Sequence, residues 1–191
     1  MITSNTVRQA ALIATLLAAP GLHAAEVAGV KLDDKIRVGA SELVLNGAGV
    51  RSKLFIKVYV GALYVGQKSA TAAAIYDSAT PRRMALRMLR DVDAESLHSA
   101  LDEGLKNNHT ADELAGIKVA SEQLAGIMKG IGKAREGDTI AIDFMADGVT
   151  VSLNGESRGK VVAPTFAKAL LKVWLGEKPA DTSLKKALLG S

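Results

Sequence analysis

The sequence predicts an α+β fold in which an antiparallel sheet is covered by a layer of helices. Strand-like segments come first, helical segments second, a pair of hairpins third and helices last, so the two kinds of element are segregated along the chain. Asx-Gly pairs between the later strands indicate hairpins, and hairpins join antiparallel strands. A parallel βαβ protein would instead alternate strands and helices.

The first 24 residues differ from the rest and predict a secretory signal peptide. They contain one basic residue, no acid, and a largely apolar run from Ala10 to Ala19 that is followed by a Pro-Gly pair and small residues. This three-part pattern is typical of a signal peptide, and the run is too short to span a bilayer comfortably. The alternative is an ordinary amphipathic helix. We therefore expect a signal peptide over 1–24, one domain over 25–191, a periplasmic location and no integral membrane segment after signal removal.

Composition excludes several kinds of function. The chain has no cysteine, which excludes a disulfide scaffold, a thiolate metal site and a catalytic cysteine. Basic residues are interleaved with acids and aromatics are few, so we expect no nucleic-acid partner. Two histidines, His98 and His109, lie outside the signal segment, in a helix and in a loop respectively. We expect no metal site and no cofactor, because these two residues lack a convincing third ligand.

Residues 26–65 predict strands. Turns are expected at Asn46-Gly47 and at the polar Ser52-Lys53 pair, before the most apolar run of the chain. A short helix is expected over 70–76. In the next segment, Met84, Leu86 and Met88 alternate with Arg83, Ala85 and Arg87, which is typical of a strand with one half-solvated face.

The second half of the chain predicts helices around a β-meander. Asp93 can cap a helix that runs to about Lys106, and Thr110 with Glu113 forms a capping box for a second helix that ends near Gly132. Two turns, Asp147-Gly148 and Asn154-Gly155, separate the strands that follow. Pro164 then begins a helix that ends at Gly176, and Asp181 caps a last short helix.

The candidate site lies in residues 46–65, which read NGAGVRSKLFIKVYVGALYV. Arg51 precedes an apolar strand that carries Lys57, Tyr59 and Tyr64. The guanidinium stays charged and its planar fork matches a carboxylate, while a tyrosine hydroxyl adds a further donor. From the residues alone, an exposed turn arginine beside core tyrosines and an anion anchor at a lipophilic pocket are both compatible with the pattern.

NGAGVR followed by FIKVYVGALYV resembles the chalcone isomerase-like family, particularly its bacterial exported branch. Three further segments match in order, namely RDVDAESLHSALDEGLKNN, GDTIAIDFMADGVTVSLNG and WLGEKPADTSLKKALLG. The resemblance covers about residues 26–190. It implies an open-faced β-sandwich, a long antiparallel sheet with helices on one face and a cleft between them. The family contains ring-closing isomerases and non-catalytic fatty-acid binders, which hold the carboxylate with an arginine and a tyrosine.

The resemblance assigns roles to few residues. Arg51 matches the family arginine, and Tyr59 falls where the isomerases have threonine and the fatty-acid binders have tyrosine. A late active-site threonine of the isomerases falls near Val173 or Trp174, and neither has a hydroxyl. The resemblance therefore implies a non-enzymatic binder of a lipophilic carboxylate such as a fatty acid, with Arg51 and Tyr59 as ligand residues and no catalytic residue. An isomerase or intramolecular lyase acting on a non-flavonoid substrate, and an envelope interaction protein with an incidental cleft, are the alternatives.

Convergence of the two ligand residues depends on a turn. Eight extended residues would separate Arg51 from Tyr59 by about 26 Å. Both can reach one carboxylate only if the chain reverses between them, and the sequence predicts that reversal at Ser52-Lys53.

Overall fold

The computed structural model describes residues 25–190, so the predicted signal peptide lies outside the described residues. The strands are, in chain order, β1 (Ala25–Val27), β2 (Val30–Leu32), β3 (Lys35–Val38), β4 (Ser41–Lys53), β5 (Ile56–Val65), β6 (Arg82–Met88), β7 (Val92–Asp93), β8 (Lys133–Ala134), β9 (Thr139–Met145), β10 (Gly148–Leu153) and β11 (Glu156–Val162). The helices are α1 (Ala72–Tyr76), α2 (Ala94–Asn108), α3 (Ala111–Ile131), α4 (Pro164–Leu175) and α5 (Thr182–Leu188). In this part of the chain, no helix combines the length and hydrophobicity that a membrane span requires.

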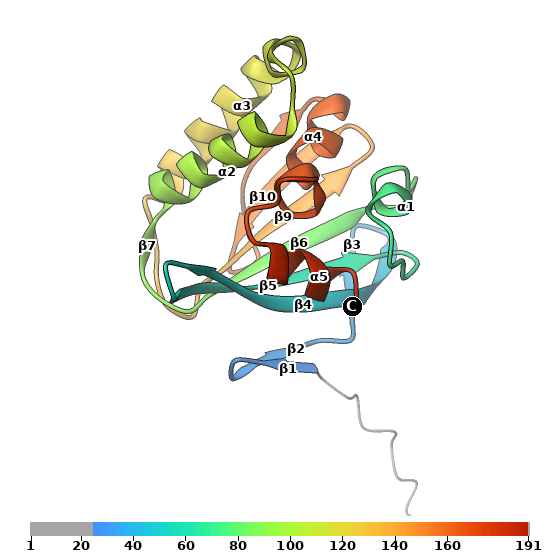
Figure 1. The fold of residues 1–191 in the computed structure, drawn as a ribbon, viewed down its shortest axis with the longest axis vertical. Helices are drawn as coiled ribbons and strands as arrows, with labels where there is room; N and C mark the ends of the chain where they lie inside the picture. Colours follow the sequence, from blue (N-terminus) through green and yellow to red (C-terminus); the bar gives the residue numbers. More distant parts are fainter. Residues whose placement is uncertain (1–24, 191) are drawn as a thin grey trace, which may run out of the picture.

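One curled sheet of seven strands organises the molecule, with the order β11-β10-β9-β6-β5-β4-β3. Each neighbouring pair is antiparallel. Neighbouring strands of this sheet follow one another directly in the chain except β6 and β9, between which lie β7, α2, α3 and β8. Figure 1 shows the long helices on one side of the sheet and the β1–β2 hairpin on the other. The predicted α+β fold, an antiparallel sheet covered by helices, is confirmed.

The two faces of β5 belong to two different cores, because successive strand residues point to opposite faces. Tyr59 and Leu63 face the helices and join the main core, which also contains Phe166 and Trp174. Val60, Ala62 and Tyr64 face the other way and pack in a smaller core with residues such as Leu32. Burial on both faces explains why this strand has the most apolar sequence in the chain.

Asn46-Gly47 is not a turn, contrary to the sequence prediction. The pair lies inside β4, at a shift in register against β5. The buried Asn46 amide donates to the carbonyls of Ser69 (3.0 Å) and Leu188 (2.6 Å) and accepts from the Ser69 N–H (2.8 Å). A Cβ on Gly47 would lie 2.1 Å from the Ala187 carbonyl oxygen. Both residues therefore hold the end of α5 against the sheet. Asn and Gly are residue types typical of turns, but here they make a long-range contact.

The chain reverses two residues later than predicted. Ser52 and Lys53 are the last residues of β4, and the turn itself is formed by Leu54 and Phe55, with φ of 48° and 68°. Positive φ at both central residues is the geometry of a type I′ hairpin. The prediction missed this turn because bulky apolar residues seldom adopt that conformation.

The predicted caps of α3 and α5 are confirmed. Thr110 and Glu113 form the reciprocal capping box of α3, which ends at Gly132 with a φ of 73°. Asp181 caps α5 by accepting from the Leu184 N–H at 2.9 Å. Asp93 precedes α2 as predicted, although its side chain makes no capping bond. These local rules fix where the helices begin, and thereby which residues they direct toward the sheet.

Candidate functional site

The β4–β5 hairpin brings the two predicted ligand residues together. Arg51 lies directly opposite Tyr59 in the sheet, and a bulge at this point places Lys57 opposite Ser52, so Val58 is an extra residue. The guanidinium carbon of Arg51 is 5.8 Å from the centroid of the Tyr59 ring. This distance is within the range of a cation–π contact. The hairpin removes the 26 Å separation expected for an extended chain.

Tyr59 presents a buried hydroxyl with one hydrogen-bond partner. The residue is 3% exposed, and the indole N–H of Trp174 on α4 donates to its oxygen at 2.9 Å. Within residues 25–190 the hydroxyl has no other hydrogen-bond partner, so its own proton has no acceptor there. A phenol can donate one bond while it accepts another. The Tyr59 O–H is therefore available to a ligand oxygen.

Burial raises the pKa of Tyr59 to about 12. Desolvation is the largest cause, because it disfavours the phenolate; the charges of Arg51 and the bond from Trp174 act in the opposite direction. At neutral pH the hydroxyl is consequently protonated. Tyr59 can serve as a hydrogen-bond donor but not as a phenolate base.

Arg51 is half-buried and makes no ion pair with any described residue. Asp181, whose charge acts on Tyr59, has both carboxylate oxygens engaged by backbone amides. Its Oδ2 accepts from the Ser52 N–H at 3.1 Å and its Oδ1 accepts from the N–H of Leu184. The guanidinium therefore keeps donors that an external anion could use.

A small apolar cavity lies between this pair and the helices. Its volume is about 20 Å³, which has room for about one water molecule. It is lined by Arg51, Tyr59, Leu86, Leu97, Ala100, Leu101, Met128, Ile140, Ile142, Val173 and Ala180. Val173 thus contacts the cavity while Trp174 bonds to Tyr59, so both positions matched to the missing threonine belong to the site. A ligand-sized cleft between sheet and helices remains a prediction.

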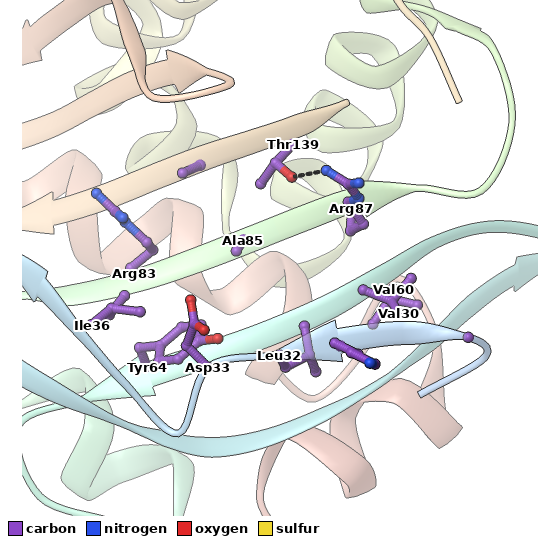
Figure 2. Close-up of a pocket in the computed structure, with 13 residues that line it drawn as sticks. Val30, Leu32, Asp33, Ile36, Val60, Tyr64, Arg83, Ala85, Arg87 and Thr139 are labelled. Carbon is purple, nitrogen blue, oxygen red and sulfur yellow. Dashed lines mark hydrogen bonds between the residues drawn. The ribbon is translucent and has the colours of Figure 1, made fainter. Parts of the chain in front are cut away.

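A larger cavity of about 570 Å³ lies on the opposite face of the sheet, beneath the β1–β2 hairpin. Tyr64 from β5 and Arg83 and Arg87 from β6 line it, and Figure 2 shows Arg87 directed toward Thr139. Arg83 is already held by Asp143, with Nε–Oδ1 at 2.5 Å and Nη2–Oδ2 at 2.7 Å, and Arg87 donates to the Thr139 hydroxyl at 3.2 Å. The sequence predicted that these arginines lie on a half-solvated face of the sheet. It contained no sign that the first hairpin would fold over them.

His98 and His109 line neither of these two cavities. Within the described range 25–190, no group of three His, Cys, Asp or Glu side chains lies close enough to hold a metal ion. His109 packs near the start of α3, where its Nδ1 lies 2.9 Å from the Leu105 carbonyl oxygen. Its role is thus local to the α2–α3 connection.

An antiparallel sheet with one helical face, and an arginine-tyrosine pair between them, defines an α+β protein of the open-faced β-sandwich class. The family model described as chalcone isomerase-like matches residues 24–190, and the chain belongs to this family. The crystal structure of an Arabidopsis thaliana fatty-acid binding protein is similar, with a TM-score of 0.66 at 16% identity over 84% of this chain and 92% of that one. That likeness shows a shared fold. A search of curated proteins finds no match.

Proposed function

We propose that this protein is an exported, non-enzymatic binder of a lipophilic carboxylate such as a fatty acid, with the carboxylate at Arg51 and Tyr59. One observation carries the proposal: a guanidinium without an ion-pair partner in residues 25–190 lies beside a buried hydroxyl whose proton lacks an acceptor there. An ionised carboxylate has two acceptor oxygens and a negative charge, which complement both groups. Export to the periplasm is proposed from the apolar pattern of residues 1–24.

The lining of the small cavity supports a hydrocarbon tail. Below the arginine-tyrosine pair the walls are aliphatic, with Leu86, Ile140 and Ile142 from the sheet and Leu97 and Leu101 from α2. Apolar walls with a few placed polar groups are the usual design of a small-molecule site. The walls would bind the tail by burial of apolar area, while the polar pair fixes its orientation.

Space for the tail has to be created. The cavity measures about 20 Å³, whereas sites for ligands of this size are typically about 300–1,000 Å³. Three of its wall residues, Leu97, Ala100 and Leu101, belong to α2. We propose that α2 moves away from the sheet when the ligand enters, so that the helix acts as the movable wall.

The cavity on the opposite face is larger but less suited to an anion. Arg83 already makes two short bonds to Asp143, and that carboxylate would repel a second one. Arg51 has no such partner among the described residues. The proposal therefore places the carboxylate at Arg51 and uses the opposite cavity as a control.

Two further observations favour binding over catalysis. A phenol with a pKa of about 12 is a weak proton donor to a reacting group, because general acids work best when their pKa lies near the working pH. The similar Arabidopsis structure is that of a fatty-acid binding protein. Membership of the chalcone isomerase-like family supports the fold on which this proposed function depends.

Titration calorimetry with a long-chain fatty acid and with the corresponding primary alcohol tests the proposal. We expect Arg51→Gln to weaken fatty-acid binding by about ten- to a hundredfold, since a charged hydrogen bond contributes about 1.5–3 kcal/mol. Tyr59→Phe should weaken it by about five- to tenfold. Both variants should affect the much weaker binding of the uncharged alcohol far less than that of the fatty acid.

Two matched variants serve as controls. Arg37→Gln removes the same charge from an exposed position on β3, and Tyr64→Phe removes a hydroxyl from the other face of the same strand as Tyr59. Both should bind the fatty acid as the parent does. Equal affinity of Arg51→Gln and the parent would refute the proposed anchor, and a selective loss in Tyr64→Phe would place the ligand in the opposite cavity.

A further inference from the structure

The tip of the β4–β5 hairpin exposes three consecutive apolar side chains. Leu54 is 83% exposed, Phe55 102% and Ile56 50%. The other large apolar side chains that are this exposed in residues 25–190 are single, Val119 and Val162. Isolated exposed apolar residues are common on proteins, whereas a contiguous group marks an interaction site. Figure 1 shows this tip at one end of β4 and β5, beside the segment that leads to β7.

The backbone of the tip does not favour these residues. Leu54 and Phe55 have φ of 48° and 68°, a conformation that Asn-Gly adopts most readily. The chain uses that very pair, Asn154 and Gly155, for the equivalent turn between β10 and β11, with φ of 52° and 84°. Neither turn stability nor core packing therefore accounts for leucine and phenylalanine here. Their exposed side chains are the feature that remains to be explained.

Basic side chains surround the apolar tip. Lys53 and Lys57 flank it directly and are exposed. Arg90 is also exposed and lies just past the end of β6, next to Leu89, whose N–H donates to the carbonyl of Val58. None of these three makes an ion pair with a residue in 25–190. Two acids lie on neighbouring segments, Asp91 before β7 and Asp181 before α5. Asp91 pairs with Lys133 at 2.9 Å, so three basic side chains remain against the single charge of Asp181, and the surroundings of the tip keep a net positive charge.

We propose that this tip docks the protein onto an anionic lipid bilayer, with Leu54, Phe55 and Ile56 inserted at the boundary between headgroups and acyl chains. Peripheral binding of this kind depends on buried apolar area together with attraction between basic residues and anionic lipid. A protein partner fits less well, because protein interfaces are depleted in lysine and bury about 800 Å² on each side, more than a hairpin tip offers. The inference goes beyond the proposed function and requires no bound ligand.

Cosedimentation of the full chain with vesicles tests the docking. The vesicles contain phosphatidylcholine alone or mixed with phosphatidylglycerol. For the double variant Leu54→Asn/Phe55→Gly we expect about a hundredfold weaker partitioning into the mixed vesicles, because less apolar side-chain area would be buried in the bilayer. The same variant should keep its Tm or raise it by about 2–4 °C, because Asn-Gly suits the turn. Loss of binding would then not arise from misfolding.

Further variants separate the contributions. Lys53→Gln and Lys57→Gln should each lower partitioning about fivefold on mixed vesicles and leave neutral vesicles unaffected. Val119→Ser and Val162→Ser remove other exposed apolar side chains, from α3 and β11, and should bind as the parent does. Equal partitioning of the Asn-Gly variant and the parent would overturn the proposal. So would self-association of the parent, lost in that variant, without any binding to vesicles.

Because the chain has no cysteine, one introduced thiol reports on one position. An environment-sensitive fluorophore on Leu54→Cys should shift to the blue with mixed vesicles, while the same label on Val119→Cys should not. This comparison is independent of any contribution from residues 1–24, which both proteins share. Identical spectra at the two positions would contradict insertion of the tip.

Discussion

Removal of the Tyr59 hydroxyl should change how stability depends on alkaline pH. In the folded protein the pKa of Tyr59 is about 12, against 10.0 for a free tyrosine. Between these values the unfolded chain loses the phenolic proton while the folded chain retains it. The folded state thus binds more protons, and stability falls as the pH rises. A difference of this size corresponds to about 2.7 kcal/mol, lost at about 1.4 kcal/mol per pH unit from pH 10 to pH 12.

Tyr59→Phe has an opposing cost at neutral pH. The buried indole N–H of Trp174 loses its acceptor, and an unsatisfied buried donor costs about 1–3 kcal/mol. With a cost near 1.5 kcal/mol, the variant is the less stable protein at pH 8 and matches the parent at about pH 11. Above that pH it should be the more stable of the two. The crossing distinguishes lost proton linkage from simple damage to the core, which would lower stability equally at every pH.

Urea unfolding of both proteins at intervals from pH 8 to pH 11.5 measures this effect. Only the difference between the two curves is interpreted, since lysines and the other tyrosines titrate in both proteins. A difference that stays constant across the range would refute the assignment of a raised pKa to a buried, ligand-free Tyr59. Such a result would also weaken the argument that its proton is held ready for a ligand oxygen.

Two further changes test the packing around the site. Gly47→Ala should destabilise the protein by about 3 kcal/mol or more and lower its Tm, because the new Cβ would lie 2.1 Å from a backbone oxygen of α5. Gly116→Ala is its control, since nothing lies within 4 Å and alanine favours the helix; it should keep or raise the Tm, and an equal loss in both would contradict the close approach. Ala100→Leu should fill the 20 Å³ cavity and weaken fatty-acid binding at least about tenfold, whereas Ser99→Leu, on the exposed side of α2, should not. Unchanged binding in Ala100→Leu, measured by the same calorimetry, would exclude this cavity as the tail site.

The sequence predicted those parts of the fold that follow from local chemistry. Alternation along 82–88 predicted a strand, Thr110 with Glu113 predicted the start of α3, and Asn154-Gly155 predicted a tight turn. Each of these rules acts within a few residues, so it operates in the same way before and after the chain has folded. The order of the elements then determined the α+β class.

The errors share a different physical cause. Asn46-Gly47 has the composition of a turn, but its amide bonds and its missing side chain serve α5, more than a hundred residues later. The contact from Trp174 to Tyr59 and the cover that the first hairpin places over Arg83 are likewise set by tertiary packing. A sequence contains no local sign of such contacts. The sequence predicted the pairing of Arg51 with Tyr59 only on the condition that the chain reversed between them.

The long-range contact at Asn46 and Gly47 also bears on Arg51, which makes no ion pair within residues 25–190. It fixes the end of α5 on β4, and the start of that helix is fixed by Asp181, whose second oxygen accepts the Ser52 N–H. A carboxylate whose charge reaches Tyr59 thereby accepts two backbone amides. These two bonds hold the carboxylate at the start of α5, and among residues 25–190 it makes no ion pair with Arg51, so the guanidinium keeps donors for a ligand. Asp181 is therefore a positioning residue of the proposed site, although it would repel the carboxylate that the site binds.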